Sequence, residues 1–208
     1  MIRSATRLGL LGLCATALLA CGPSTPSPTP DIVVICLDTL RADRVGVYGR
    51  TPTLTPHLDS FAATATVHER AWATSPWTLP SHASMFTGQY AFEHGAHSVS
   101  LEEIGEDGVD ATNNVVPLTG EAFTIAERLQ AAGYRTGAVV ANAGYVTSRY
   151  GLHQGFEHFD VAMRDVPEIV EAVDAWLAGG DGRPTFLFVN TMDTHRPFNL
   201  TPRPGFVQ

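Results

Sequence analysis

The sequence predicts an α/β fold whose sheet is mainly parallel and carries helices on both faces. Three runs of apolar, largely β-branched residues have the length of strands, and segments with the apolar spacing of helices separate them. A strand, a helix and a further parallel strand form a crossover unit, and successive units place helices on both faces of one sheet. The alternation along this chain is typical of that fold class.

The expected elements follow in order along the chain. Strands are predicted at residues 32–37, 135–141 and 185–190. The first of them, IVVICL, is apolar throughout, so we expect it to be buried on both faces. Helices are predicted at residues 56–67, 80–87, 121–132 and 167–178, with Thr55 and Asp165 as N-caps, Pro56 and Pro80 in first turns, and Gly88, Gly133 and Gly179 just beyond the ends.

Composition excludes several classes of protein. The 208 residues hold 13 basic side chains, all of them arginine, and 21 acidic ones, for a net charge of -8. Nucleic acid is not an expected partner, because its binding depends largely on basic residues that neutralise phosphates. No apolar run reaches the roughly 18 residues of a membrane-spanning helix. Residues 100–120 are rich in acidic side chains, and a solvated loop is favoured there over a calcium loop.

The N-terminus has the pattern of an export signal with a lipid attachment point. Arg3 and Arg7 precede a 13-residue apolar stretch at residues 8–20, which suits a signal peptide. The stretch ends in Leu-Leu-Ala-Cys21, which resembles the lipobox of bacterial lipoproteins; an ordinary secretory signal is the alternative. Residues 22–30, GPSTPSPTP, predict an extended tether. We therefore expect a chain that is anchored through Cys21 to the bacterial cell envelope, on the periplasmic or outer-membrane side.

Candidate site residues follow the ends of predicted strands. Ligands of open α/β sheets bind at the carboxyl ends of the strands, where Asp38 and His195 lie. Thr78 precedes the short helix at residues 80–87, whose amino end favours an anion such as phosphate or sulfate. Asp38 offers an oxygen ligand for Ca²⁺ or Mg²⁺, the Thr78 hydroxyl a nucleophile, and His195 a proton donor or an anion or metal ligand.

Each of these residues also has a purely structural interpretation. An aspartate after a strand often only caps a turn or a helix, and a threonine before a helix is usually an N-cap. A histidine in a loop is usually a surface residue. The case for a functional site therefore depends on the order of several motifs rather than on one residue.

Several short motifs follow one another between residues 31 and 200. They are Asp38-Thr39 with Arg41 and Gly46 to Gly49, TPHLDSFA at 55–62, Thr78-Leu79-Pro80-Ser81-His82 with Thr87-Gly88, His94-Gly95, Gly133 to Thr136, residues 155–160, and Asp193 to Pro197. In this order they resemble the N-terminal part of the sulfatases, a family of the alkaline-phosphatase-like superfamily. The resemblance implies that fold, with residues 31–208 as a sulfatase N-terminal domain.

The resemblance also implies roles for individual residues. It places Thr78, His82 and His195 in the catalytic site and Asp38 and Thr39 at a divalent metal, in the first place Ca²⁺, with Mg²⁺, Mn²⁺ or Zn²⁺ as alternatives. It implies a sulfated or phosphorylated small molecule or glycan as the substrate. It does not predict the oligomeric state.

The chain departs from the family pattern at several positions. The family oxidises a cysteine or serine to formylglycine, and Thr78 stands at that position, so no formylglycine is expected. His82 replaces an arginine, Thr39 replaces a second metal-binding aspartate, and Asn142 lies near the position of a family lysine. A later Asp-His-Gly-like or Asp-Asn-Gly-like metal motif is absent before Gln208, so the domain is expected to be truncated.

Three functions remain open from the sequence. The first is an exported sulfatase-like hydrolase of sulfate esters, with a metal-assisted nucleophile at the start of a helix. The second is a phosphodiester hydrolase or transferase that uses Thr78 directly. The third is an inactive fragment.

Overall fold

The computed structural model of the chain describes residues 29–99 and 114–197. The expected signal peptide, Cys21 and nearly all of the tether lie outside these residues, as does most of the acidic segment at 100–120. Contacts divide the chain between Pro30 and Asp31, and the fold below is that of the second unit, Asp31–Gln208. Among the described residues, none of the helices has the length and apolar character to cross a membrane.

A four-stranded parallel sheet forms the centre of this unit. Its strands are β1 (Ile32–Leu37), β6 (Thr185–Thr191), β4 (Arg135–Val140) and β5 (His158–Val161), in that spatial order. All three neighbouring pairs are parallel, so the predicted sheet type is confirmed. Strand β5 was not predicted, because its four residues, HFDV, are short and half polar.

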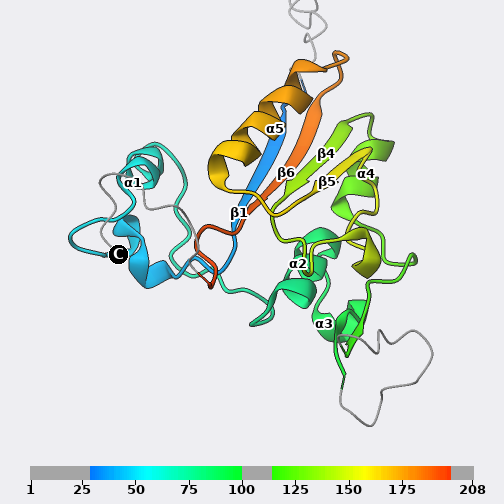
Figure 1. Cartoon of the computed structure of the whole chain (residues 1–208), viewed down its shortest axis with the longest axis horizontal. Coiled ribbons are helices and arrows are strands. Elements are labelled where there is room, and N and C mark those ends of the chain that lie inside the picture. The colour runs from blue at the N-terminus through cyan, green and yellow to red at the C-terminus, as the bar shows by residue number, and fades with distance from the viewer. Residues whose placement is uncertain (1–28, 100–113, 198–208) are drawn as a thin grey trace, which may run out of the picture. The chain divides into compact units, whose positions relative to one another are not determined.

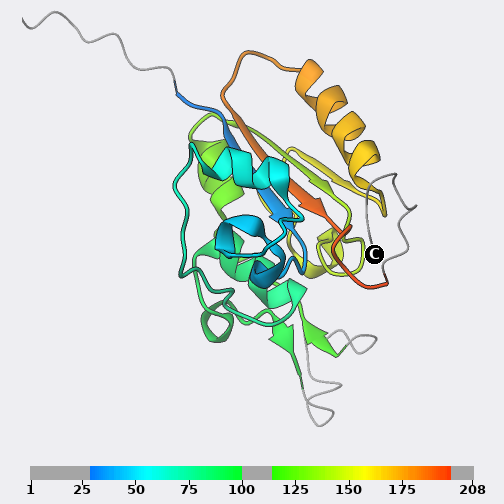
Figure 2. The ribbon, with the colours of Figure 1, turned by 90° about the vertical axis from the view of Figure 1, so that its left-hand side faces the viewer.

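Helices cover both faces of the sheet, as Figures 1 and 2 show. On one face, Ile169 and Trp176 of α5 (Val166–Ala178) pack against β4 and β6. On the other face lie α2 (Thr78–Thr87) and α4 (Ile125–Ala131), whose buried residues contact the opposite side of the same two strands. Phe86 of α2 meets Phe188 of β6 edge to face, with ring centroids 4.9 Å apart. This packing fixes the position of α2 relative to the sheet.

Shorter elements complete the described part. They are the 3₁₀ turns η1 (Ala42–Arg44), η2 (Gly46–Tyr48) and η3 (Ser148–Tyr150), the helices α1 (Pro56–Ala62) and α3 (Ala91–His94), and the two-stranded pair of β2 (His97–Ser98) and β3 (Val115–Val116). The residues of α1 are all at least partly exposed, in contrast to those of α2.

Several predicted helix ends are corrected. Helix α1 stops at Ala62 rather than residue 67, since the following residues, ATATV, include β-branched ones that favour extended backbone. Thr55 occupies the N-cap position without capping: its hydroxyl donates to the Asp59 side chain instead. Helix α4 begins at Ile125 rather than residue 121, because Thr124 and Glu127 form a reciprocal capping box.

The caps of two other helices agree better with the sequence. The Asp165 carboxylate accepts from the Glu168 backbone N–H at 3.2 Å, which confirms it as the N-cap of α5. Gly88 ends α2 with a φ of 73°, a left-handed conformation that suits glycine. Helix α2 itself starts at Thr78, two residues earlier than predicted.

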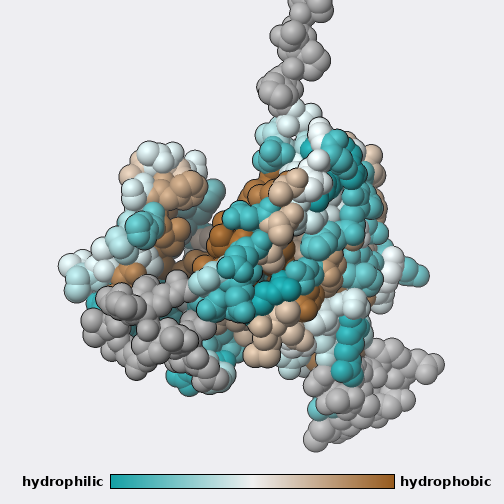
Figure 3. Space-filling model, turned by 45° about the horizontal axis from the view of Figure 1, so that its top comes forward, coloured by the Kyte–Doolittle hydropathy of each residue, from teal (hydrophilic) through white to brown (hydrophobic). Residues whose placement is uncertain are grey.

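The prediction that β1 is buried on both faces is wrong. Strand β1 lies at the edge of the sheet, and its burial alternates along the strand. Val33 is 53% exposed and Ile35 is 64% exposed, and their register partners in β6 lie on the face that α5 covers. Helix α5 reaches β4 and β6 but leaves these side chains open. Hydrophobic residues accordingly gather beside α5 at the surface in Figure 3.

Candidate active site

The carboxyl ends of three adjacent strands meet around the side chain of Asp38. Asp38 follows β1, Asn190 lies near the end of β6, and Asn142 lies two residues beyond β4. The Nδ2 groups of Asn142 and Asn190 both donate to Oδ2 of Asp38, at 2.8 and 3.4 Å. All three residues are at most 5% exposed. Because a buried charge is costly without donors, these two amides stabilise the carboxylate at the sheet edge.

Thr78 lies at the first position of α2, beside this cluster. Its Oγ1 lies 3.5 Å from Nδ2 of Asn142, the same amide group that bonds Asp38. Trp77, the N-cap residue, has an extended backbone, and its ring packs edge-on against Tyr145 at 5.3 Å. Thr78 and Asp38 therefore occupy the same edge of the sheet. The amino end of a helix carries unpaired N–H groups and positive potential, which suit a bound anion.

The turns that follow β1 and β6 are joined by two hydroxyl groups. Thr194 donates to the carbonyl oxygen of Asp38 at 2.6 Å, and Thr39 donates to the carbonyl oxygen of Thr194 at 3.0 Å. His195 follows in the same turn, and its Nδ1 donates to the carbonyl oxygen of Arg196 at 2.5 Å. Within the described residues, no hydrogen bond joins the His195 ring to Asp38 or Thr78.

His82 is an interior residue rather than a cation at the surface of the site. It is 3% exposed, and its ring lies edge to face against Phe86 and Phe188. Nδ1 donates to the carbonyl oxygen of Thr78 at 2.9 Å, which leaves the lone pair on Nε2. Burial lowers the pKa of His82, so the ring is neutral near pH 7. His82 therefore holds the backbone of Thr78 and does not supply the charge expected of an arginine substitute.

Cys36 lies close to the same carboxylate, but its thiol is unreactive near neutral pH. Burial first, and the charge of Asp38 second, raise the pKa of the Cys36 thiol to about 11. Only the thiolate is a strong nucleophile or metal ligand, so near neutral pH this thiol behaves as a small apolar side chain.

The described residues offer few oxygen ligands to a divalent cation. Calcium takes about 6–8 oxygen ligands, whereas Asp38 is the one carboxylate in the cluster described above. Asn142 and Asn190 point N–H groups, and not oxygen atoms, toward the Asp38 carboxylate. The Thr39 hydroxyl donates its hydrogen to the carbonyl oxygen of Thr194. Across residues 29–99 and 114–197, no three His, Cys, Asp or Glu side chains are grouped to hold a metal ion. These residues do not by themselves make a divalent-metal site.

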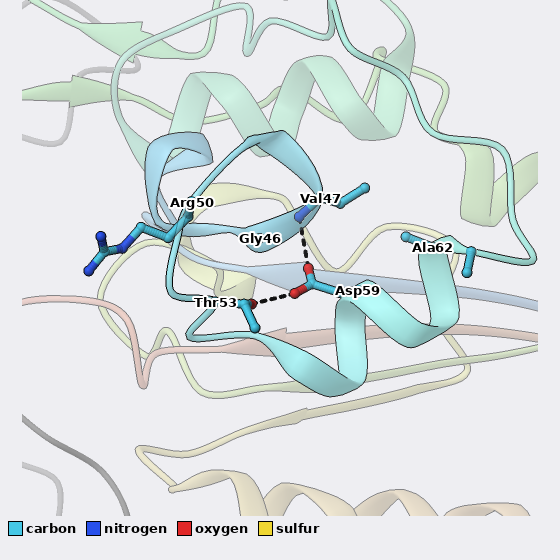
Figure 4. Close-up of a pocket in the computed structure, with 7 residues that line it drawn as sticks. Gly46, Val47, Arg50, Thr53, Asp59 and Ala62 are labelled. Atoms are coloured by element: carbon cyan, nitrogen blue, oxygen red, sulfur yellow. Dashed lines mark hydrogen bonds between the residues drawn. The ribbon is translucent and has the colours of Figure 1, made fainter.

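A surface cavity of about 340 Å³ lies elsewhere, between η2 and α1. Figure 4 shows the Asp59 carboxylate at its centre, bonded to the Thr53 hydroxyl and to the Val47 backbone N–H. The bond from Thr53 contributes most to lowering the pKa of Asp59. The Arg50 guanidinium points away from these groups in the same view. None of the predicted site residues lines this cavity. The bonds of the Asp59 carboxylate to Thr53 and Val47 hold the η2 turn against α1. Nε of Arg50 is buried and finds no hydrogen-bond partner among the described residues.

Three residues at these strand ends are not among the site residues that the sequence predicts. Asn142 enters the sequence pattern as a departure from the family, Thr194 as a member of the motif at 193–197, and Asn190 as the end of a predicted strand. A usable signal was present, since Asn142 and Asn190 come at the ends of the apolar runs GAVVA and TFLFV, where Asp38 was found by the same rule. The motif at 193–197 contains Thr194, but nothing local marks its contact to Asp38, which spans 156 positions of the chain.

Comparison with solved structures supports the fold. The structure superposes with a TM-score of 0.66 on a protein solved in complex with its substrate D-glucosamine-2-N,6-O-disulfate, at 19% identity over 84% of this chain and 36% of that one. It also superposes on the phosphonate monoester hydrolase of Agrobacterium radiobacter, with a TM-score of 0.63 and 18% identity, over 85% of this chain and 43% of that one. At such identities the likeness concerns the fold alone.

Comparison of sequences identifies the family. The chain is 30% identical over 113 residues to an N-acetylgalactosamine-6-O-sulfatase of Bacteroides thetaiotaomicron, covering 54% of this chain and 20% of that protein. It is 30% identical over 146 residues to arylsulfatase A of Bos taurus, and the match covers 67% of this chain and 27% of that protein. The chain thus matches less than a third of the length of these relatives. The Sulfatase family profile matches residues 30–205, nearly the whole described unit. The chain belongs to the sulfatase family, and its fold is that of the alkaline-phosphatase-like superfamily.

Proposed function

We propose that this chain carries the nucleophile-bearing part of a sulfate ester hydrolase, with the Thr78 oxygen as the nucleophile. The observation that carries the proposal is the position of Thr78. It opens a ten-residue helix at the carboxyl edge of the sheet, and the amide of Asn142 lies between its hydroxyl and Asp38. Family membership supports sulfate esters as the substrate class.

The proposed chemistry uses groups at this edge. Oγ1 of Thr78 attacks the sulfur of a sulfate monoester, a bond from Oγ1 to sulfur forms, and the ester S–O bond breaks. The threonine proton is lost to solvent, and the alcohol leaves with a proton. Water then attacks the sulfur, which releases sulfate and restores the hydroxyl. The amino end of α2 favours the negative charge of the sulfo group throughout. We propose His195, which lies in the neighbouring turn, as the proton donor to the alcohol.

The sulfatase family generally uses a divalent metal. Among the described residues, we propose Asp38 as the carboxylate ligand of such a metal and Thr39 as a neighbouring ligand. The described residues do not by themselves fit such an ion, so the chemistry proposed above uses only groups of the chain.

Sulfated sugars are the proposed substrates within this class. The support comes from similar proteins, among them an N-acetylgalactosamine-6-O-sulfatase and a structural neighbour complexed with a disulfated glucosamine.

The test compares turnover of two chromogenic probes, an aryl sulfate and a bis-aryl phosphodiester, by the full chain and its variants. We expect turnover of the aryl sulfate, and its loss in Thr78→Ala because no neighbouring group replaces the oxygen. Ser81→Ala is the matched control, since it removes a hydroxyl within the same helix. Equal turnover by the wild type and Thr78→Ala would refute Thr78 as the nucleophile.

A second candidate function is cleavage or transfer of a phosphodiester. The observation that favours it is the threonine itself, since oxidation of a secondary alcohol gives a ketone and not the aldehyde that family sulfatases use. Faster turnover of the phosphodiester than of the aryl sulfate, with the same dependence on Thr78, would favour this alternative. Turnover of neither probe would favour the inactive reading.

We also propose that the mature protein is a lipoprotein of the bacterial cell envelope. The support is the sequence of residues 1–30, in which a basic start and an apolar stretch precede Cys21 and a proline-rich tether. Mass spectrometry of the mature N-terminus should find a lipid-modified Cys21. An uncleaved Met1 or an unmodified thiol at Cys21 would contradict the proposal.

A further inference from the structure

We propose that Asn142 is a positioning residue, which holds the Thr78 hydroxyl and the Asp38 carboxylate in a fixed relative orientation for reaction. The inference rests on the function proposed above. It is drawn from the hydrogen bonds of the Asn142 side chain, which link the end of β4 to both groups.

The orientation of the Asn142 amide is set by its own turn. Oδ1 accepts from the backbone N–H groups of Gly144 and Tyr145, at 3.2 and 3.0 Å. Only the oxygen of an amide can accept such bonds, so the NH₂ group must face the opposite way, toward the sheet edge. This arrangement is an Asx turn, in which a side chain bonds the backbone two residues on.

The two hydrogens of Nδ2 then have two acceptors. One hydrogen is donated to Oδ2 of Asp38 at 2.8 Å, the distance of a charge-assisted hydrogen bond. Oγ1 of Thr78 lies 3.5 Å from the same nitrogen. Hydrogen bonds at catalytic groups are often long without substrate and shorten in the reacting complex. A donor at this position favours negative charge on Oγ1 as the hydroxyl proton leaves.

The main chain of Asn142 is also held on both sides. Its N–H donates to Oδ1 of Asn190 at 3.0 Å, and its carbonyl accepts from Val146 at 3.1 Å. With 3% of its surface exposed, the residue cannot shift without breaking several of these bonds. Such a group can limit the rotamers of a neighbouring hydroxyl, which is the property required of a positioning residue.

The experiment uses Asn142→Ser in the full chain. A serine hydroxyl can accept the turn bonds but is too short to reach Asp38 or Thr78. Asn142→Thr serves if the serine variant does not fold, because its hydroxyl keeps the turn acceptor, its methyl group fills part of the space left by the amide, and it is equally too short to reach Asp38 or Thr78. Ala143→Ser is the control, because Ala143 is an exposed neighbour in the same turn. The first readout is the set of three-bond couplings from the Thr78 methyl carbon, which report the χ1 rotamer without any substrate.

We expect one Thr78 rotamer in the wild type and in Ala143→Ser, and averaging over rotamers in Asn142→Ser. The second readout is aryl sulfate kinetics, in which kcat should fall about tenfold or more while KM changes little. An unchanged single rotamer in Asn142→Ser would overturn the inference, whatever the turnover. If the wild type turns over neither probe, the proposed function fails, and the couplings still decide whether Asn142 positions Thr78.

Discussion

Thr194 donates its hydroxyl hydrogen to the backbone carbonyl oxygen of Asp38, and the 2.6 Å bond joins two turns that are far apart in the sequence. Thr39 returns a bond to the carbonyl oxygen of Thr194, so the turns after β1 and β6 brace each other. The side chain of Asp38 is bonded separately by two amides. Both its backbone and its carboxylate are thus fixed before any ligand arrives.

Loss of the Thr194 hydroxyl should destabilise this edge of the sheet. In Thr194→Val the shape is nearly kept, but the carbonyl oxygen of Asp38 loses a donor. We expect the free energy of unfolding to fall by about 1 kcal/mol, as measured by urea denaturation. Thr66→Val, at an exposed position, is the control and should change little. Equal midpoints for the two variants would show that the bond adds nothing to stability.

Two buried histidines should make the protein less stable in acid. Ala96 donates its backbone N–H to Nδ1 of His94 at 3.0 Å, so the ring proton is on Nε2, which donates to Oγ of Ser84. Burial is the main cause that lowers the pKa of His94 below its ordinary 6.5, and burial lowers that of His82 as well. The unfolded chain therefore binds protons more readily, so stability is full above pH 6.5 and decreases as pH falls below it.

The measurement is the urea midpoint at about pH 7.5 and about pH 5.5. His94→Gln should show a smaller loss between the two conditions than the wild type. His57→Gln changes an exposed histidine, and its urea midpoint should fall between the two conditions by as much as that of the wild type. A loss in His94→Gln as large as in the wild type would remove His94 as a source of the acid sensitivity.

Gly137 allows α5 to pack closely on the sheet. A Cβ at this position would lie 2.5 Å from Cζ2 of Trp176, closer than real contacts allow. The guanidinium of Arg135 lies over that ring, 3.9 Å from its centroid. We expect Gly137→Ala to destabilise the fold by about 1–3 kcal/mol in thermal or urea unfolding.

The control for Gly137→Ala is Gly120→Ala, where a Cβ would meet nothing within 4 Å. That change should be neutral or slightly stabilising, because alanine reduces the freedom of the unfolded chain. If both variants unfolded at the same denaturant concentration, the close approach of Trp176 would not limit the size of residue 137.

The exposed face of β1 should bind apolar probes and promote self-association. Val33→Thr with Ile35→Thr keeps the β-branched shape while removing apolar surface at two open positions. We expect weaker binding of the dye ANS and less light scattering, with little change in stability. Val34→Thr is the matched control on the opposite face, where Val34 packs against the core, and it should instead destabilise the fold. Unchanged dye binding in the double variant would show that the apolar surface that binds the dye lies elsewhere.

The sequence predicted best those elements whose signals are local. The centres of β4 and β6 are continuous apolar runs, and Asp165 and Gly88 act as caps in the structure as they do in the pattern. The burial of β1 could not be predicted, because an apolar run does not show which neighbour covers it. Strand β5 was missed because it owes its place to pairing with β4 and not to its own composition.

The site was predictable only in part, for a related reason. The end-of-strand rule indicated Asp38 and the helix start indicated Thr78, because both positions follow from local pattern, and the structure places the two residues beside each other. The Asn142 amide lies close to both Asp38 and Thr78 because its own turn fixes the orientation of the side chain. A local sequence pattern does not contain that orientation. The interior position of His82 likewise follows from how α2 packs on Phe188, which the motif does not contain.

If the Thr78 oxygen is the nucleophile, a covalent intermediate must form on it, and this intermediate can be detected. The full chain is incubated with an aryl sulfate, quenched in acid during turnover and digested, and the peptide that contains Thr78 is examined by mass spectrometry. We expect this peptide to gain one sulfo group on Thr78, and we expect Thr78→Ala to lose both the adduct and the turnover. Turnover that continues in Thr78→Ala, with no adduct on the wild-type peptide, would contradict this assignment of the nucleophile.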